Sequence, residues 1–157
     1  MSINNKSASL HNKSGKLESG LRTRGLFNKK SEPDKPLVSV ITVVKNGEEY
    51  LEGTIKSVIN QTYDNIEYII IDGGSTDRTL DIIKKYEDKI AYWISEKDEG
   101  ISDALNKGVK LSRGKIIGLI HSDDYYVSRD VIENVVNEFN NCLLYTSPSP
   151  RDLSTSR

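Results

Sequence analysis

Apolar residues between Leu37 and Asn141 follow two alternating spacings. Short runs of β-branched and other apolar residues are typical of buried strands, whereas apolar residues that recur every three or four positions are typical of amphipathic helices. The runs predict strands at residues 38–44, 66–71, 90–94 and 115–120, and the helical spacing predicts helices at residues 48–60, 77–86, 100–111 and 131–139. This βαβαβαβα order predicts an α/β domain with a parallel sheet and right-handed crossovers.

Residues that are typical of helix ends occur at two of these predicted helices. Ser75 or Thr76 can serve as the N-cap of the helix that begins near Asp77. Asp77 itself is interpreted as a cap or as a partner of the helix dipole. At the end of the third helix, Gly114 lies near the C′ position, where glycine is favoured.

The two flanks of the domain differ from it in composition. Residues 1–35 are polar and carry too few large apolar side chains for a core, so we expect a disordered or loosely docked arm followed by a domain at residues 36–141. Basic side chains of the arm suit contact with anionic lipid, although a solvated tail is the plainer interpretation. These side chains are Arg22, Arg24, Lys29 and Lys30.

In residues 142–157 the helical spacing stops, and Ser and Pro become frequent. The stretch from Cys142 to Asp152 matches what one reading frame of a common transposase-derived sequencing adapter encodes. We therefore expect a non-native tail and leave it out of the fold prediction, with an ordinary Ser/Pro-rich linker as the alternative. On this interpretation the natural protein continues past Asn141.

The bulk composition excludes several classes of protein. The 22 basic residues are balanced by 23 acidic ones, which is unlike the basic face of a nucleic-acid binder, so we expect no nucleic-acid partner. Cys142 is the single cysteine and fits a reducing compartment. No run approaches the roughly 18 apolar residues of a membrane span, and the N-terminus lacks the apolar stretch of a signal peptide. We expect a soluble, cytoplasmic chain, with peripheral association at the cytoplasmic membrane face as a further option.

Two predicted strands end in acidic residues. The second strand runs into Asp72, and the fourth runs into His121-Ser122-Asp123-Asp124. Because ligands of open α/β sheets bind outside the carboxyl ends of the strands, both clusters are expected to face one crevice. Carboxylates gathered there suit a sugar ring, a ribose, or a hard cation that carries phosphates.

Five stretches follow one another in a characteristic order. They are residues 38–46, residues 57–63, residues 67–79, residues 96–108 with Gly114, and residues 121–124. In this order they resemble the nucleotide-sugar-binding half of family 2 glycosyltransferases, which are inverting enzymes with a GT-A fold. The resemblance implies transfer of a sugar from a nucleoside diphosphate, with a UDP-type donor favoured, to a glycan or lipid-linked acceptor. It also implies a role in bacterial cell-surface polysaccharide synthesis.

The resemblance assigns roles to the two acidic clusters. It makes Asp72 the acceptor of hydrogen bonds from the nucleoside, although Asp72 also suits the start of a turn around Gly73-Gly74. Asp123 would bind the ribose, and Asp123 with Asp124 would hold Mg²⁺ or Mn²⁺ against the diphosphate. The sequence departs from the family's D-x-D pattern because His121 replaces its first acid.

The first turn of the domain also departs from the family. Val43 and Lys45 are placed against the donor by the resemblance, but the family often has an aromatic ring where this chain has Lys45. Lys45 is suited either to phosphate or base contact or to a solvated surface. Away from this turn, Tyr68, Tyr92 and Trp93 are interpreted as packing residues.

One role is unfilled in the predicted site. Inverting transfer needs a general base for the acceptor hydroxyl, and the resemblance places that acid well beyond Asn141. Neither Asp130 nor Glu133 lies in a suitable motif, so no catalytic residue is assigned, and we expect the chain to bind donor without turnover. The alternatives are a non-catalytic nucleotide-binding or inert fragment and a phospho-acceptor signalling domain. The last requires an acidic pair after the first strand, where this chain has Lys45-Asn46-Gly47.

Overall fold

The structure is a computed structural model that describes residues 15–145 of the 157-residue chain. Its strands are β1 (Leu17–Ser19), β2 (Val38–Val44), β3 (Ile66–Asp72), β4 (Tyr92–Ser95) and β5 (Ile116–Leu119). Its helices are α1 (Leu51–Ile59), α2 (Thr79–Lys85), α3 (Ile101–Leu111) and α4 (Val131–Tyr145), with a 3₁₀ turn at Glu87–Lys89. The first fourteen residues of the predicted arm and residues 146–157 of the predicted tail lie outside the described part.

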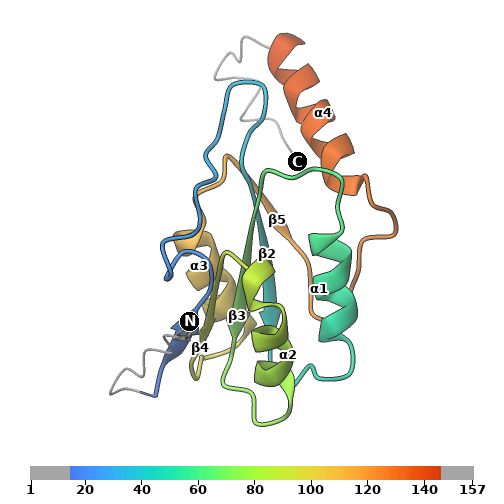
Figure 1. The fold of residues 1–157 in the computed structure, drawn as a ribbon. Coiled ribbons are helices and arrows are strands. Elements are labelled where there is room, and N and C mark those ends of the chain that lie inside the picture. Colours follow the sequence, from blue (N-terminus) through green and yellow to red (C-terminus); the bar gives the residue numbers. More distant parts are fainter. Residues whose placement is uncertain (1–14, 146–157) are drawn as a thin grey trace, which may run out of the picture.

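The strands form one mixed sheet in the order β1-β4-β3-β2-β5 (Figure 1). β2 pairs in parallel with β3 and with β5, and β3 pairs in parallel with β4. Only β1 is antiparallel, paired with β4 in register Leu17 to Ser95. The predicted α/β architecture with a mostly parallel sheet is therefore confirmed.

Helices cover both faces of the sheet, as expected for parallel strands that are buried on both sides. One core contains inward-facing residues of α1, α2 and α4, and the other lies under α3. Gly108 brings α3 close to the sheet, because a Cβ there would lie 2.6 Å from Cγ2 of Ile41. Tyr68, Tyr92 and Trp93 are buried, which confirms their prediction as packing residues.

The four parallel strands all point to the lower end of the molecule as drawn in Figure 1. The loops that follow β2, β3, β4 and β5 therefore gather at that end. The opposite end is closed by the segment before β2, where the Tyr63 hydroxyl donates to the carbonyl oxygen of Pro36.

The arm predicted at residues 1–35 differs from the structure in its described part. Residues 17–19 extend the sheet, and Gly20 packs so closely on β4 that a Cβ would lie 2.8 Å from the carbonyl oxygen of Ala91. Arg22 donates to the carbonyl oxygen of Leu111 at 2.7 Å and lies 3.6 Å from the buried carboxylate of Glu67. A few well-placed backbone and charge contacts thus dock a segment that has little apolar side-chain surface.

Several predicted boundaries shift by a few residues. α1 begins at Leu51, and α2 begins at Thr79 after Arg78, with no side-chain cap from Ser75 or Thr76. Gly114 does not have the left-handed conformation of a helix terminus. It is needed for close approach, because a Cβ there would lie 2.5 Å from the backbone nitrogen of Ser39. α4 continues to Tyr145, past the predicted boundary at Asn141.

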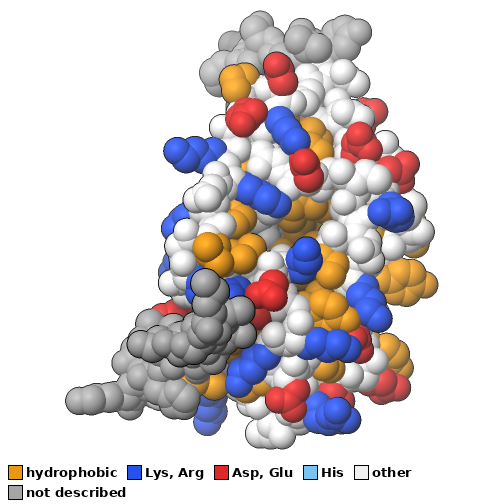
Figure 2. Space-filling model, viewed as in Figure 1, with side chains coloured by type: hydrophobic (Ala, Val, Ile, Leu, Met, Phe, Trp, Pro, Cys, Tyr) orange, Lys and Arg blue, Asp and Glu red, His pale blue; other side chains and the backbone are white. Residues whose placement is uncertain are grey.

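Acidic and basic side chains are interspersed over the face shown in Figure 2. Two of the ion pairs link neighbouring elements: Lys85 with Glu52 between α2 and α1, and Lys107 with Glu96 beside α3. Among the described residues, no helix is long and apolar enough to cross a membrane.

Candidate functional site

A pocket of about 890 Å³ opens at the carboxyl ends of β2 and β5. Four predicted site residues line it: Val43, Lys45, Asp123 and Asp124. His121 and Ser122 line it beside the two acids, and Tyr50, Asp98 and Glu99 are among its other lining residues. The structure thus brings the first turn and the acidic motif of the sequence into one hollow at the strand ends. Asp72, which the strand-end argument placed in the same crevice, does not line it.

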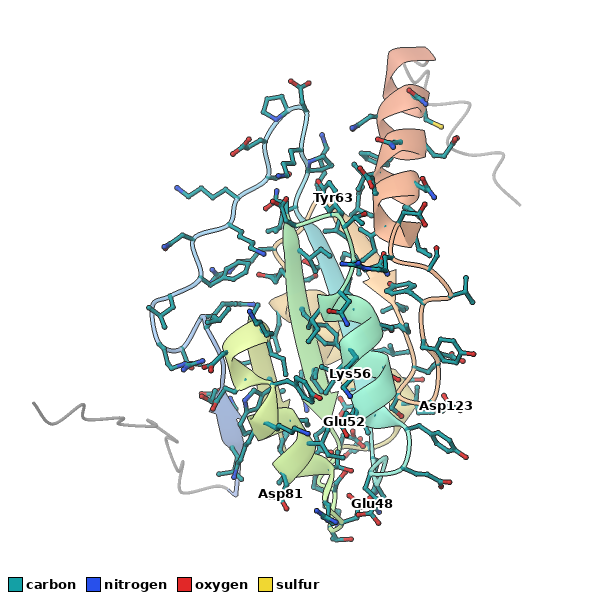
Figure 3. The ribbon with its side chains drawn as sticks, turned by 45° about the vertical axis from the view of Figure 1, so that its right-hand side comes forward. Glu48, Glu52, Lys56, Tyr63, Asp81 and Asp123 are labelled. Atoms are coloured by element: carbon teal, nitrogen blue, oxygen red, sulfur yellow. The ribbon has the colours of Figure 1, made fainter. Side chains whose placement is uncertain are left out.

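The acidic turn after β5 is held by helix α1. The Thr54 hydroxyl contacts the carbonyl oxygens of Ser122 and Asp124 at 3.0 and 2.5 Å, and the Asp124 N–H donates to His121 at 3.1 Å. Thr54 is buried, whereas Asp123 and Asp124 are exposed. The backbone is therefore fixed while both carboxylates remain open to the pocket, and Figure 3 shows Asp123 near the lower end of α1.

The end of α1 anchors the chain that follows the acidic turn. Ser57 Oγ accepts the N–H of Tyr126 at 3.1 Å, and Gln61 Nε2 donates to the carbonyl oxygen of Ser128 at 2.7 Å. Gln61 Oε1 also accepts the N–H of Ile132 at 3.1 Å. These contacts give residues 57–63 a structural role, which is to position the loop between β5 and α4.

Asp72 does not line the pocket, although it pairs with Val44, which does. Its side chain is fully buried, and Oδ2 accepts the N–H groups of Gly74 and Ser75 at 3.2 and 3.0 Å and the hydroxyl of Ser95 at 2.6 Å. Oδ1 accepts the hydroxyl of Ser75. Asp72 therefore shapes the turn after β3, in line with the alternative considered above. Its contact with a nucleoside stays a prediction.

Polar contacts join the loop after β2 to the loop after β3. Asn46 has a left-handed backbone (φ 51°), and its Oδ1 accepts the N–H of Thr76 at 2.8 Å. Asp77 accepts the N–H groups of Thr79 and Glu48 at 2.9 and 3.2 Å. Desolvation raises the pKa of Asp77, but hydrogen bonds from Thr79 and Glu48 outweigh it, so the pKa lies below its usual value. Asp77 thus acts as a structural anchor beside the helix start, close to its predicted capping role.

The donor set of the pocket suits a divalent cation that is also bound by its substrate. Within residues 15–145, no group of three or more His, Cys, Asp and Glu side chains is placed to hold a metal ion. Mg²⁺ and Mn²⁺, however, commonly take one or two carboxylates and complete their shell with phosphate oxygens and water. Asp123 and Asp124 fit that pattern.

Several residues of the pocket wall were not predicted as site residues from sequence, Tyr50 and Asp98 among them. Tyr50 is 57% exposed at the start of α1, and Asp98 follows β4 in the loop that leads to α3. The rule that singled out Asp72 and Asp123, an acid at the end of a parallel strand, also points to the acids after β4, Glu96 and Asp98, without telling the two apart. The sequence therefore contained a usable signal for Asp98 but none for Tyr50.

Comparison with known proteins gives a consistent result. The family profile described as Glycosyl transferase family 2 matches residues 39–148. An uncharacterized glycosyltransferase of Rickettsia prowazekii is 43% identical over 106 residues, which cover 67% of this chain and 32% of the relative. The putative teichuronic acid biosynthesis glycosyltransferase TuaG of Bacillus subtilis is 38% identical over 102 residues, covering 63% of this chain and 40% of TuaG. This chain spans about a third of the length of the curated relatives that it matches.

Solved structures share the fold. TarS of S. aureus in complex with UDP-GlcNAc has a TM-score of 0.61 and 24% identity, covering 67% of this chain and 31% of TarS. The mannosyltransferase PcManGT of Pyrobaculum calidifontis, in complex with GDP-Man and Mn²⁺, has a TM-score of 0.60 and 22% identity, covering 72% of this chain and 34% of that protein. At these identities the likeness shows the fold alone, a GT-A glycosyltransferase domain.

Proposed function

Because the chain belongs to glycosyl transferase family 2, we propose that its pocket binds a nucleoside-diphosphate sugar and that the whole protein transfers the sugar to an acceptor with inversion. One observation carries the proposal. The exposed carboxylates of Asp123 and Asp124 and the side chain of Lys45 line a single pocket at the carboxyl ends of β2 and β5.

The proposed roles follow from the chemistry of each group. Asp123 and Asp124 would hold Mg²⁺ or Mn²⁺ together with the diphosphate, and Asp123 would also accept a ribose hydroxyl. A cation bound there supplies positive charge against the departing nucleoside diphosphate. Lys45 would face the phosphates or the base across the pocket, with Val43 beside the nucleoside. Asp72 would act on the nucleoside from the end of β3, through the turn that it holds.

The remaining roles belong to the whole protein. The name of the relative TuaG supports an acceptor in bacterial cell-surface polysaccharide synthesis, and we propose a glycan or lipid-linked acceptor at the cytoplasmic face of the membrane. We assign the general base to the two thirds of the relatives' length that this chain does not span. On this proposal the present chain binds donor without turnover.

The proposal is tested by calorimetric titration of the chain with UDP, with and without Mn²⁺. We expect binding to need Mn²⁺ and to weaken about tenfold or more in Asp124→Ala, since hydrogen bonds and ligand contacts of charged groups contribute about 1.5–3 kcal/mol each. Asp130→Ala serves as control, because Asp130 is an exposed acid six positions along the chain that does not line the pocket. Equal affinity of wild type, Asp124→Ala and Asp130→Ala would refute the proposed site.

A further inference from the structure

Asp98 differs both from the fully bonded Asp72 and from the exposed acids Asp123 and Asp124. It is half-buried in the pocket wall, and its Oδ1 accepts the N–H of Gly100 at 3.1 Å. Among residues 15–145, no hydrogen bond or ion pair reaches its Oδ2. Asp98 therefore keeps one acceptor oxygen without a partner in a side chain that faces the proposed donor site.

The turn after β3 holds that oxygen in place. A Cβ on Gly73 would lie 2.5 Å from Oδ2 and 3.0 Å from Cγ of Asp98, so a larger residue at this position would force the carboxylate to move. The Gly73 N–H donates to the carbonyl oxygen of Val44 at 2.9 Å, which ties the turn to β2. The hydrogen bond from Gly100 to Oδ1 and the space beside Gly73 for Oδ2 together favour this position of the carboxylate.

This position is on the side of the pocket away from the metal-binding acids. Asp98 packs on the turn after β3, whereas Asp123 and Asp124 follow β5, and β2 lies between these two strands. Two strand spacings correspond to roughly 10 Å, enough for a ribose between a diphosphate at one side and a base at the other. A carboxylate repels phosphate oxygens and accepts N–H groups, so Asp98 suits the neutral base.

We propose that Asp98 recognises the nucleobase of the donor by accepting a hydrogen bond from a ring N–H. It therefore selects a base with such a group, uracil foremost, over a base whose ring nitrogen carries no hydrogen, such as cytosine. This inference rests on the proposed function and adds to it a residue that determines specificity. Asp72 shapes the turn after β3, Gly73 in that turn leaves space for the Asp98 carboxylate, and Asp98 supplies the acceptor oxygen.

The pyrimidine pair UDP and CDP isolates this contact. Uracil carries a hydrogen on N3 and cytosine does not, while the two bases have almost the same size. The variant Asp98→Asn keeps Oδ1 as acceptor for Gly100 and replaces Oδ2 by an NH₂ donor, which matches cytosine N3. Sites built around a buried hydrogen bond discriminate strongly against ligands that lack it, so we expect wild type to favour UDP by about tenfold or more.

The experiment measures dissociation constants of UDP and CDP with Mn²⁺ for four proteins, and repeats them with GDP and ADP to cover a purine donor. We expect the UDP-to-CDP preference to fall to about twofold or to reverse in Asp98→Asn. Gly73→Ala should also lower it, because the added Cβ displaces Asp98. Asp103→Asn is the matched control: Asp103 accepts the N–H of Glu99 at 3.3 Å but does not line the pocket, so its preference should equal that of wild type.

The possible results distinguish failure of the proposed donor site from failure of base recognition by Asp98. If no nucleotide binds to wild type, the proposed donor site is wrong, and this inference falls with it. If UDP binds with Mn²⁺ but Asp98→Asn keeps the full preference of wild type, the donor site stands and base reading by Asp98 is overturned. A purely structural role for Asp98 predicts that second result, because the amide oxygen of Asn still caps Gly100.

Discussion

At the scale of the residue, hydrogen bonds separate acids that look alike in sequence. Asp72, Asp98 and Asp123 each lie at or shortly after the end of a parallel strand. Internal donors occupy both oxygens of Asp72, Asp98 keeps one oxygen without a hydrogen bond, and Asp123 is exposed. The topological rule that ligands bind at strand ends pointed to Asp72 and Asp123 in the sequence, but it was not applied to Asp98. The rule did not predict which carboxylate oxygens accept internal hydrogen bonds. That depends on Ser95 and Gly73, which come close to these acids only in the folded chain.

The pKa of Glu52 tests the position of a single side chain. The Lys85 ammonium and the Tyr86 hydroxyl donate to its Oε1 at 2.7 and 2.6 Å and hold the pKa of Glu52 at about 2. Because this pKa lies below the unfolded value of about 4.3, the contact stabilises the fold at neutral pH and is lost as pH falls from about 4.3 towards 2. Titration of the Glu52 carboxyl by NMR should show the low pKa, a rise in Lys85→Ala, and no rise in Lys84→Ala. A Glu52 pKa at its usual value in wild type would contradict the observed contact.

At the scale of the element, apolar spacing predicted all eight strands and helices between residues 38 and 141, with ends displaced by a few residues. The ends shifted where polar side chains bond to neighbouring loops, as Ser75 does with Asp72 and Asn46 and not with its own helix. β1 was missed because its three residues form a strand only through pairing with β4. Short edge strands carry little sequence signal of their own.

Two glycines on different elements test this account of packing. Gly114→Ala places a Cβ 2.5 Å from the backbone nitrogen of Ser39, and we expect it to lower the free energy of unfolding by about 1–3 kcal/mol, as overpacking typically does. Gly53→Ala, inside α1 with no atom within 4 Å of the new Cβ, should instead raise it by about 0.5–1 kcal/mol. Urea unfolding of both variants measures the two changes, and equal shifts would contradict the close approach at Gly114.

At the scale of the whole molecule, the segment before β2 is part of the domain although the family profile begins only at residue 39. Arg22 reaches three separate elements: it lies over the Tyr92 ring at 5.1 Å, donates to Leu111 at the end of α3, and faces Glu67 on β3. Burial lowers the pKa of Arg22, in keeping with its position between layers. Composition favoured a loose arm here because a docked segment held by backbone and charge contacts resembles a disordered one in sequence.

Removal of the Arg22 side chain tests this docking. Glu67 is fully buried and its Oε2 has no hydrogen-bond partner among the described residues, so Arg22→Ala would leave an uncompensated charge and cost roughly 3 kcal/mol in unfolding free energy. Lys35→Ala, in the same segment but at an exposed pair with Asp64, should cost less than about 1 kcal/mol. Chemical denaturation compares them, and similar small losses in both variants would show that the segment is only loosely attached.

The central claim is that the carboxyl ends of β2 and β5 form a metal-dependent site for a nucleoside diphosphate. Its most direct test is the broadening of backbone amide NMR signals by Mn²⁺ in the presence of UDP, because paramagnetic broadening locates the ion itself. We predict loss of signals from Ser122 and Asp124, while those of Tyr63 and Asp64, at the opposite end of the sheet, persist. Signals of Ser122 and Asp124 that persist while Mn²⁺ and UDP broaden signals elsewhere in the chain would contradict the claim.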